Sequence, residues 1–284
     1  TVLDNLMYDQ NVLLENYIKD NFSFVYGDVR DKQTIKELTS KSDAIIHLAS
    51  IVGAPACKKN ETLAKEVNVD GTKNIVDQLS SDQILLFAST GSVYGKIEGM
   101  CNEDWTPNPL SLYGSTKLDG ERMALNLNNS VAFRFATAYG LSPRLRLDLL
   151  PNDFVLNAIR NKYLVVYDKK FRRTFIHVTD IVRSYMHMLD NIDKVKGNAY
   201  NIGSELNNYT KEDLVNKIKQ HVNFQVYYAD EGIPDPDQRD YEVSYKKLAE
   251  TNFEVKIDID RGIQELVRGF ENLRVRSDFA NISF

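Results

Sequence analysis

The sequence predicts an α/β protein built on a doubly wound parallel sheet, followed by a smaller α/β region. Short apolar runs at 43–49, 84–88 and 131–135 alternate with helical stretches, which is the pattern of a parallel sheet. Small or polar residues follow these runs directly, where an open sheet of this kind binds its ligand. From residue 151 onward the alternation loosens, which indicates a second region.

The chain opens with an apolar strand that ends in an acidic residue, Asp4, followed by Asn5. In a dinucleotide-binding sheet, an acidic residue after the second strand hydrogen-bonds the adenosine ribose. Asp4 fits that role, and its alternative role is that of a turn or helix-cap residue. A short amphipathic helix is expected over 11–19 and a strand over 22–26.

A glycine-rich phosphate loop, Gly-x-Gly-x-x-Gly or Gly-x-x-Gly-x-x-Gly, does not occur in the sequence. The first strand, which precedes that loop, stands in the middle of a doubly wound sheet, so its absence would leave neighbouring backbone groups unpaired. We therefore expect that roughly 25 to 30 residues are absent upstream of Thr1.

Asp28 and Val29 follow the strand over 22–26. The Asp28 carboxylate is positioned either to accept a hydrogen bond from an adenine amino group or to cap the helix expected over 32–38. The strand over 43–49 contains His47, for which a place in the core with a backbone partner is more plausible than catalysis. Its small-residue exit would let the backbone approach a pyrophosphate.

A long helix is expected over 61–79, interrupted around Asn68, whose amide would face either solvent or the ligand site. The strand over 84–88 leads into Ser89 and Thr90. Tyr113 and Lys117 lie four residues apart on the next helix, 113–127, and therefore share one face. A neighbouring ammonium lowers the pKa of a phenol, so Tyr113 can act as a general base, with Thr90 bonded to the reacting hydroxyl.

The second region is expected to contain helices and short strands in a less regular order. Thr210 and Asp213 form a capping box at the start of a helix that extends to Val222. The other elements expected after the strand at 131–135 are a helix from 152, strands at 164–167, 172–178 and 199–203, helices at 180–189 and 261–274, and a loop at 232–240.

Composition excludes several classes of function. A net charge of -5 without a basic cluster disfavours nucleic acid as the main ligand. Two distant cysteines indicate neither a disulfide framework nor a zinc site, and we expect no metal. An apolar run of the roughly 18 residues that a membrane span needs is not present, and no signal peptide opens the chain. These features favour a cytoplasmic location.

Taken together, the motifs resemble the extended short-chain dehydrogenase/reductase family of sugar-nucleotide epimerases, dehydratases and reductases. The resemblance covers the whole chain except its missing front, and the order of its motifs makes it specific. The motifs are Asp4, Gly27-Asp28-Val29, His47-Leu48-Ala49, Asn68-Val69-Asp70-Gly71-Thr72, Ser89-Thr90 through Gly95, Tyr113-x-x-x-Lys117, Phe133-Arg134, Arg173 with Phe175-Ile176-His177-Val178, and Tyr200-Asn201-Ile202-Gly203.

The family implies a Rossmann-type NAD-binding domain over 1–150, to which 174–203 returns, and a substrate-binding domain over 151–173 and 204–284. It implies catalysis by Thr90, Tyr113 and Lys117, with a nucleotide sugar losing hydride from C4 to NAD. The implied cofactor contacts are Asp4, Asn5, Asp28, Val29, Leu48, Ala49, Ser50, Asn68, Ser89, Tyr113, Lys117, Phe135 and Ala136. The implied substrate contacts are Thr90, Gly91, Ser92, Arg144, Asn152, Arg173 and Arg239.

Some segments resemble a narrower group, the GDP-linked heptose 4-dehydrogenases of bacterial capsule synthesis, which implies a GDP-linked sugar in preference to a UDP-linked one. These segments are 4–10, 52–55, 141–148 and 235–241. In the 4,6-dehydratase branch an Asp-Glu pair follows the catalytic Thr, whereas this chain has Gly91 and Ser92, which disfavours elimination of water.

Two other functions stay open at this stage. A 4-epimerase that retains NAD shares the first chemical step, and a catalytically inactive nucleotide-binding protein would explain the missing phosphate loop. The resemblance also implies a homodimer that pairs the helices 61–79 and 113–127 of two subunits.

Overall fold

The computed structural model describes residues 1–8, 12–97, 99–229 and 242–272, and the chain forms two compact units. The first comprises Thr1–Gly95, Glu103–Arg134 and His187–Tyr200; the second comprises Lys96–Asn102, Phe135–Met186 and Asn201–Phe284. In the described part of the chain, no helix is both long and apolar enough to cross a membrane. The predicted division by function differs in placing four segments, 96–102, 135–150, 174–186 and 201–203, with the first unit, and it stays a prediction.

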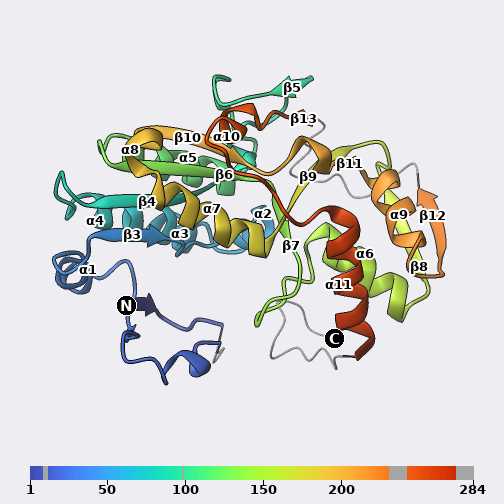
Figure 1. Cartoon of the computed structure of the whole chain (residues 1–284), viewed down its shortest axis with the longest axis horizontal. Coiled ribbons are helices and arrows are strands. Elements are labelled where there is room, and N and C mark those ends of the chain that lie inside the picture. Colours follow the sequence, from blue (N-terminus) through green and yellow to red (C-terminus); the bar gives the residue numbers. More distant parts are fainter. Residues whose placement is uncertain (9–11, 98, 230–241, 273–284) are drawn as a thin grey trace. The chain divides into compact units, whose positions relative to one another are not determined.

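The main sheet has four strands in the order β10-β6-β4-β3, so the fold predicted from the alternating apolar runs is confirmed (Figure 1). Strands β3 and β4 are parallel, with His47 paired to Phe87. The bounds of the strands are Ala44–His47 for β3, Ile84–Thr90 for β4, Ser130–Phe135 for β6 and Asn198–Ile202 for β10.

Strands β1 (Val2–Asp4) and β2 (Phe24–Tyr26) form a separate parallel pair. Among the described residues, neither strand bonds to the four-stranded sheet. Ile46 on β3, the outermost strand of that sheet, is 44% exposed although it belongs to an apolar run. The strand that we expect upstream stays a prediction.

Helices of the first unit pack around an apolar core that includes Val67, Leu85 and Phe87. Asp31, and not Asp28, caps α1, because its side chain accepts a hydrogen bond from the Gln33 N–H. The elements are α1 (Lys32–Thr39), α2 (Ala54–Lys59), α3 (Glu61–Lys65), the π-helical turn η2 (Glu66–Asp70), α4 (Gly71–Val76), the 3-10 turn η3 (Gly91–Val93), α5 (Leu112–Leu125) and α8 (Ile192–Val195).

The helix predicted over 11–19 is wrong: in the described residues 12–19 the structure has only the 3-10 turn η1 (Leu14–Asn16). Its apolar side chains find little to pack against, since Leu14 is 67% and Ile18 is 88% exposed. Isolated helices of this length are marginal in water, and amphipathic spacing stabilises a helix only where a partner covers the apolar face.

The second unit has its own core, which includes Tyr139, Phe154 and Leu214, and three small sheets in the orders β11-β9-β7, β12-β8 and β13-β5. The predicted capping box of Thr210 and Asp213 is confirmed at the start of α9 (Lys211–Lys219). The strands are β5 (Met100–Cys101), β7 (Thr137–Tyr139), β8 (Tyr163–Tyr167), β9 (Arg172–His177), β11 (Asn208–Thr210), β12 (Gln225–Ala229) and β13 (Glu242–Val243).

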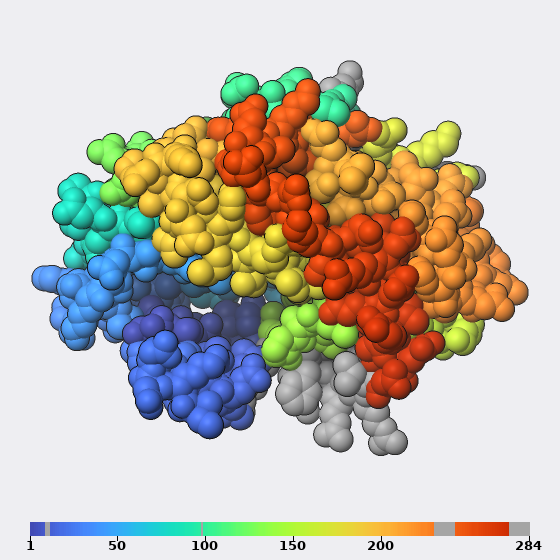
Figure 2. All heavy atoms as spheres, viewed as in Figure 1, coloured from blue at the N-terminus to red at the C-terminus, as the bar shows by residue number. Residues whose placement is uncertain are grey.

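Helix α11 adjoins α9 on the surface of this unit, as the red and orange atoms show in Figure 2. Helix α7 begins in the second unit and ends in the first. The remaining bounds are Leu150–Arg160 for α6, Val178–Asp190 for α7, Glu205–Asn207 for the 3-10 turn η4, Lys211–Lys219 for α9, Lys246–Ala249 for α10 and Ile259–Asn272 for α11. The loop predicted at 232–240 lies outside the described residues.

Candidate active site

Strand β4 ends at Thr90, which is buried and begins the turn η3. The Thr90 hydroxyl accepts a hydrogen bond from the Ser92 N–H at 3.2 Å and lies 3.3 Å from the Ser92 hydroxyl. The turn after β4 therefore places the hydroxyl groups of Thr90 and Ser92 side by side at the carboxyl end of the strand.

Helix α5 meets this turn directly. The Ser111 hydroxyl caps α5 by accepting a hydrogen bond from the Gly114 N–H at 3.2 Å. A Cβ atom on Gly114 would lie 2.7 Å from the Ser92 carbonyl oxygen and 2.8 Å from the Pro109 Cβ, so only glycine permits this approach. Because Tyr113 precedes Gly114, the structure brings the predicted base to the turn that carries Thr90 and Ser92.

Lys117 lies one helical turn after Tyr113 and is only 3% exposed. Its Nζ atom lies over the Phe87 ring, 4.3 Å from the ring centre. Burial lowers the pKa of Lys117 to about 7, while the charge of Glu121 opposes that shift. Within the described residues no side chain or carbonyl accepts a hydrogen bond from this ammonium.

Sequence reasoning missed a buried ion pair beside Lys117. Glu121 on α5 and Arg134 on β6 have side chains that are 3% and 6% exposed, with 2.6 Å between Oε1 and Nη2. Ser89, one of the predicted cofactor contacts, donates its hydroxyl to Glu121 at 2.5 Å. Arg134 also donates to the Tyr94 hydroxyl at 2.9 Å. The spacing of Tyr113, Lys117 and Glu121 could have placed Glu121 on the same helix face.

Asn68 is 1% exposed and lies in the π-helical turn η2, so the alternative in which it faces solvent is wrong. Its Oδ1 accepts hydrogen bonds from the Ser50 hydroxyl and the Ile51 N–H, at 2.9 and 2.7 Å. Its Nδ2 donates to the Ile51 carbonyl and to the Thr116 hydroxyl, at 3.1 and 3.0 Å. The amide therefore joins the loop after β3 to α5, with all four of its hydrogen-bonding positions in use.

His47 is buried, as expected, but its partner is a side chain and not the backbone. The Thr72 hydroxyl donates to the Asn68 carbonyl at 2.7 Å, so His47 Nε2 donates to Thr72 at 2.9 Å. Burial, assisted by the charge of Lys117, lowers the pKa of His47 to about 3. The imidazole is therefore a neutral part of the core.

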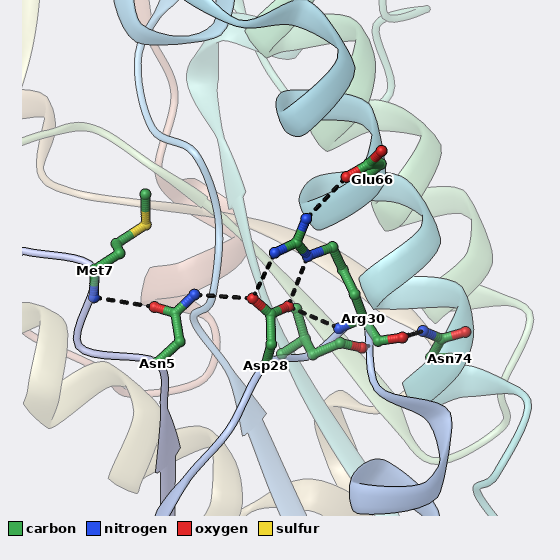
Figure 3. A network of polar contacts seen from close by, with 7 residues as sticks. Asn5, Met7, Asp28, Arg30, Glu66 and Asn74 are labelled. Atoms are coloured by element: carbon green, nitrogen blue, oxygen red, sulfur yellow. Dashed lines mark hydrogen bonds and ion pairs between the residues drawn. The ribbon is translucent and has the colours of Figure 1, made fainter.

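The predicted adenine contact, Asp28, bonds to Arg30 and Asn5 within a larger polar network (Figure 3). Its Oδ1 accepts from the N–H and Nε of Arg30, and its Oδ2 accepts from Nη2 of Arg30 and Nδ2 of Asn5, each at 2.9 Å. Arg30 also reaches Glu66 at 2.9 Å. The Arg30 hydrogen bonds lower the pKa of Asp28 to about 2. Asp28, Arg30 and Glu66 line a hollow of about 660 Å³ together with Asp31, Lys32, Asp70, Lys73 and Asn74.

The other predicted contacts of this unit lie at strand ends. Asp4 is exposed, and its Oδ1 accepts a hydrogen bond from the Leu6 N–H at 2.6 Å, which makes it the turn residue of the alternative interpretation. Its Oδ2 accepts no hydrogen bond from described residues and is available to a ligand. Leu48 and Ala49 are exposed just after β3, whereas the Val29 side chain is buried against Gly71.

The remaining predicted contacts belong to the second unit. Asn152 uses both of its donor positions within the chain: its Nδ2 donates to the Arg146 carbonyl at 3.0 Å and to the Gly140 carbonyl at 3.4 Å, and its Oδ1 accepts from the Gly140 N–H at 3.0 Å. Arg173 on β9 is buried, with Nη1 donating to the Arg172 carbonyl at 2.8 Å. Phe135 has its ring 5.6 Å from that of Tyr185, the Ala136 N–H donates to the Ile202 carbonyl, and Arg144 lies before a buried Leu145. Arg239 lies outside the described residues.

An NAD cofactor fits the first unit at two points and not at a third. Among the described residues, the Lys117 ammonium has no hydrogen-bond acceptor and Asp4 Oδ2 has no donor. Both groups suit ribose hydroxyls, which accept and donate hydrogen bonds. Asp28, by contrast, has its acceptor positions filled, so an adenine amino group would have to replace one of the present donors.

Comparison with known proteins agrees with this geometry. Residues 1–203 match the family described as "NAD dependent epimerase/dehydratase family". The chain belongs to this family of NAD-dependent enzymes.

Among individual proteins, the chain is 26% identical over 282 residues to CDP-paratose 2-epimerase of Salmonella typhi, covering 87% of this chain and 83% of that protein. Its fold is similar to the X-ray structure of Pal from Bacillus thuringiensis, with a TM-score of 0.83, 21% identity, and 96% and 91% of the two chains covered. It is also similar to UDP-glucuronic acid 4-epimerase from Bacillus cereus in complex with UDP-glucuronic acid and NAD, with a TM-score of 0.80, 21% identity, and 95% and 90% covered.

Proposed function

We propose that this protein is an NAD-dependent oxidoreductase that acts on C4 of a nucleotide-activated sugar. The observation that carries the proposal is the meeting of two elements: the end of β4 with Thr90, and α5 with Tyr113 at its start and, one turn later, a buried Lys117 ammonium that has no hydrogen-bond acceptor among the described residues. An ammonium near a phenol stabilises the phenolate, which a general base for a sugar hydroxyl requires.

In this reaction NAD, when bound, supplies an acceptor for the hydride that leaves C4. Tyr113 takes the proton of the 4-hydroxyl, which breaks the O–H bond. The C4–H bond breaks as its hydrogen leaves with both electrons, the C–O bond becomes C=O, and the product is a 4-keto sugar. Thr90 holds the hydroxyl oxygen in place at the end of β4. Lys117 holds the nicotinamide ribose, and its positive charge stabilises the Tyr113 phenolate.

Substrate recognition is proposed for Gly91 and Ser92 in the turn η3, and for Arg144, Asn152, Arg173 and Arg239. Planar guanidinium groups suit the oxygens of a diphosphate. Asn152 would contribute through the second acceptor position of its Oδ1, since Gly140 is the one described residue that donates to this oxygen. The relatives named above carry CDP- and UDP-linked sugars in their names. A GDP-linked heptose is therefore proposed only from the resemblance of the sequence segments.

A 4-epimerase is the second candidate, because it begins with the same oxidation and differs in returning the hydride to the other face of the keto sugar. The name of the similar Bacillus cereus protein favours this candidate. Dehydration is disfavoured, since Gly91 and Ser92 supply no acid for elimination of the 6-hydroxyl. An inactive nucleotide-binding protein is disfavoured because Thr90, Tyr113 and Lys117 are all retained.

The test is incubation of the purified protein with NAD and a panel of GDP-, UDP- and CDP-sugars. Absorbance of NADH reports net oxidation, and proton NMR of the sugar reports inversion at C4. Tyr113→Phe serves as the paired variant and is expected to lose activity by at least about 100-fold. Undiminished turnover in that variant would exclude Tyr113 as the base. Absence of both oxidation and inversion over the whole panel would reject the proposed function.

A further inference from the structure

The charged group nearest to Lys117 along its own helix face is a buried carboxylate that the proposed chemistry does not use. Glu121 follows Lys117 by one helical turn, at a spacing that puts Cβ atoms about 6 Å apart. Its side chain is only 3% exposed, and its oxygens accept hydrogen bonds from Arg134 and Ser89. A carboxylate held this way cannot turn toward solvent.

Two of the other titratable groups that face Lys117, His47 and Cys57, carry no charge near neutral pH. His47 on β3 is neutral, because its pKa is lowered to about 3. Cys57 on α2 is a protonated thiol, because burial raises its pKa to about 11. Tyr113 on α5 is the base itself. Apart from the phenolate that Tyr113 forms as the base, the ion-paired Glu121 is therefore the anion that acts on Lys117 from the packed elements α2, α5 and β3.

We propose that Glu121 is a positioning residue that acts through Lys117: its carboxylate, fixed by Arg134 and Ser89, supplies the counter-charge that keeps the Lys117 ammonium charged in its buried position. For catalysis this inference rests on the proposed function, since the ammonium matters there as the neighbour of the Tyr113 phenol. The electrostatic part concerns Lys117 alone and can be measured without substrate.

The direction of the effect follows from the charges. Burial favours neutral Lys117, and the negative charge of Glu121 opposes it. Glu121→Gln keeps the shape of the side chain but removes that charge, and it leaves Arg134 as an additional nearby cation. The ammonium then loses its proton at a lower pH. Ser89 lies next to Thr90 at the carboxyl end of β4. Its hydrogen bond to the Glu121 carboxylate therefore also connects α5 to this end of the strand.

The experiment uses the purified chain labelled with ¹³C-lysine, and follows the Lys117 Cε resonance by NMR as the pH is changed. The resonance is assigned by its loss in Lys117→Arg. In Glu121→Gln we expect the titration midpoint of Lys117 to fall by about one pH unit or more. Asp119→Asn is the matched control, because Asp119 lies on the same helix but is exposed, and it should leave the midpoint in place.

The variant Glu121→Gln leaves a buried guanidinium without its partner and can fail to fold. The double variant Glu121→Gln with Arg134→Met removes both charges, and we expect a smaller fall of the midpoint in the same direction. An unchanged midpoint in either folded variant overturns the proposal. Glu121→Asp, which restores the charge, should return the midpoint toward that of the unaltered protein.

Turnover supplies the second readout. If the panel experiment finds a substrate, the alkaline limb of the kcat profile should move to lower pH in Glu121→Gln and stay fixed in Asp119→Asn. If the midpoint moves but the limb does not, the catalytic part of the proposal fails. If the unaltered protein turns over no nucleotide sugar, the proposed function fails while the NMR titration still decides the role of Glu121.

Discussion

The Nζ atom of Lys117 lies 4.3 Å from the centre of the Phe87 ring, so an aromatic face and not water covers this cation. Cations over aromatic faces are attracted by the ring quadrupole, by about 0.5 to 2 kcal/mol. That attraction offsets only part of the cost of burying an ammonium, and the pKa of Lys117 falls accordingly. Stability and cofactor binding should both reflect this balance.

Stability is expected to rise with pH because of Lys117. Its pKa is about 7 in the folded chain and about 10.4 in an unfolded one. Between these values the unfolded chain binds a proton that the folded chain does not, so this contribution grows as pH rises from about 7 to about 10, by up to about 1.4 kcal/mol per unit. Urea unfolding as a function of pH measures it. Lys117→Met should remove the slope, and an unchanged slope in that variant would contradict the assignment.

Gly114→Ala is expected to displace the start of α5. The added Cβ would lie 2.7 Å from the Ser92 carbonyl oxygen, and overpacking of this kind costs about 1 to 3 kcal/mol. A shift of Tyr113 by about 1 Å should lower turnover about 100-fold. Unfolding and kcat are measured together, with the exposed Asp119→Ala as control. Normal kcat in Gly114→Ala would show that the position of α5 tolerates the shift.

Asn68→Ala should destabilise the first unit by about 3 kcal/mol, because it leaves buried groups of the 50–51 loop and Thr116 without partners. Chemical denaturation checks this value. The comparison is Gln78→Ala on the surface, for which we expect a change below about 0.5 kcal/mol. Equal effects of the two substitutions would mean that the Asn68 bonds contribute nothing to stability.

Arg30→Met is expected to tighten NAD binding by about threefold to tenfold, a gain of about 1 kcal/mol. Arg30 fills acceptor positions of Asp28 that an adenine amino group would use, and methionine retains the apolar stem while removing the donors. Calorimetric titration with NAD measures the affinity, with Lys41→Met as the surface control. A fall in affinity would instead indicate that the guanidinium itself contacts the cofactor.

The homodimer proposed through helices 61–79 and 113–127 would bring charged surfaces together. The outward positions include Lys65, Lys73, Asp119 and Arg122. We expect a dimer at micromolar concentration in light scattering coupled to size exclusion. The double reversal Lys73→Glu with Arg122→Glu should shift it toward monomer, whereas Lys41→Glu should not. A monomeric elution of the unaltered chain would reject this interface.

Much of the fold could be predicted because the central strands are uninterrupted apolar runs with polar exits. Three strands of the main sheet, β3, β4 and β6, follow from that pattern alone, whereas β10 has the mixed sequence NAYNI and its place in this sheet does not. The two-residue strands β5 and β13 could not be predicted, since their pairing depends on chain segments about 140 residues apart. The helix predicted over 11–19 was wrong because its apolar residues have helical spacing but find no surface to pack against.

The sequence predicted the reactive residues of the candidate site, but it predicted less well the buried residues that hold them in place. Tyr113 and Lys117 share a helix face by spacing, whereas the pairing of Glu121 with Arg134 depends on how α5 lies against β6. Asn68 could be placed on a helix but not turned inward, because its orientation depends on the π-helical turn. The sequence predicted that Asp28 contacts the ligand. The structure adds that Arg30 and Asn5 already donate hydrogen bonds to its carboxylate.

The turn η2 accommodates one residue more than a regular helix would over the same length. Each residue of an α-helix rotates the following side chains by about 100°. Deleting a single amino acid from 66–70 would therefore rotate α4 by about 100° relative to α3. Side chains that are now buried on one of these helices would then face solvent. Variation in length should be far less tolerable at this short stretch than at the connecting loops, which gives alignments of related chains a fixed reference point.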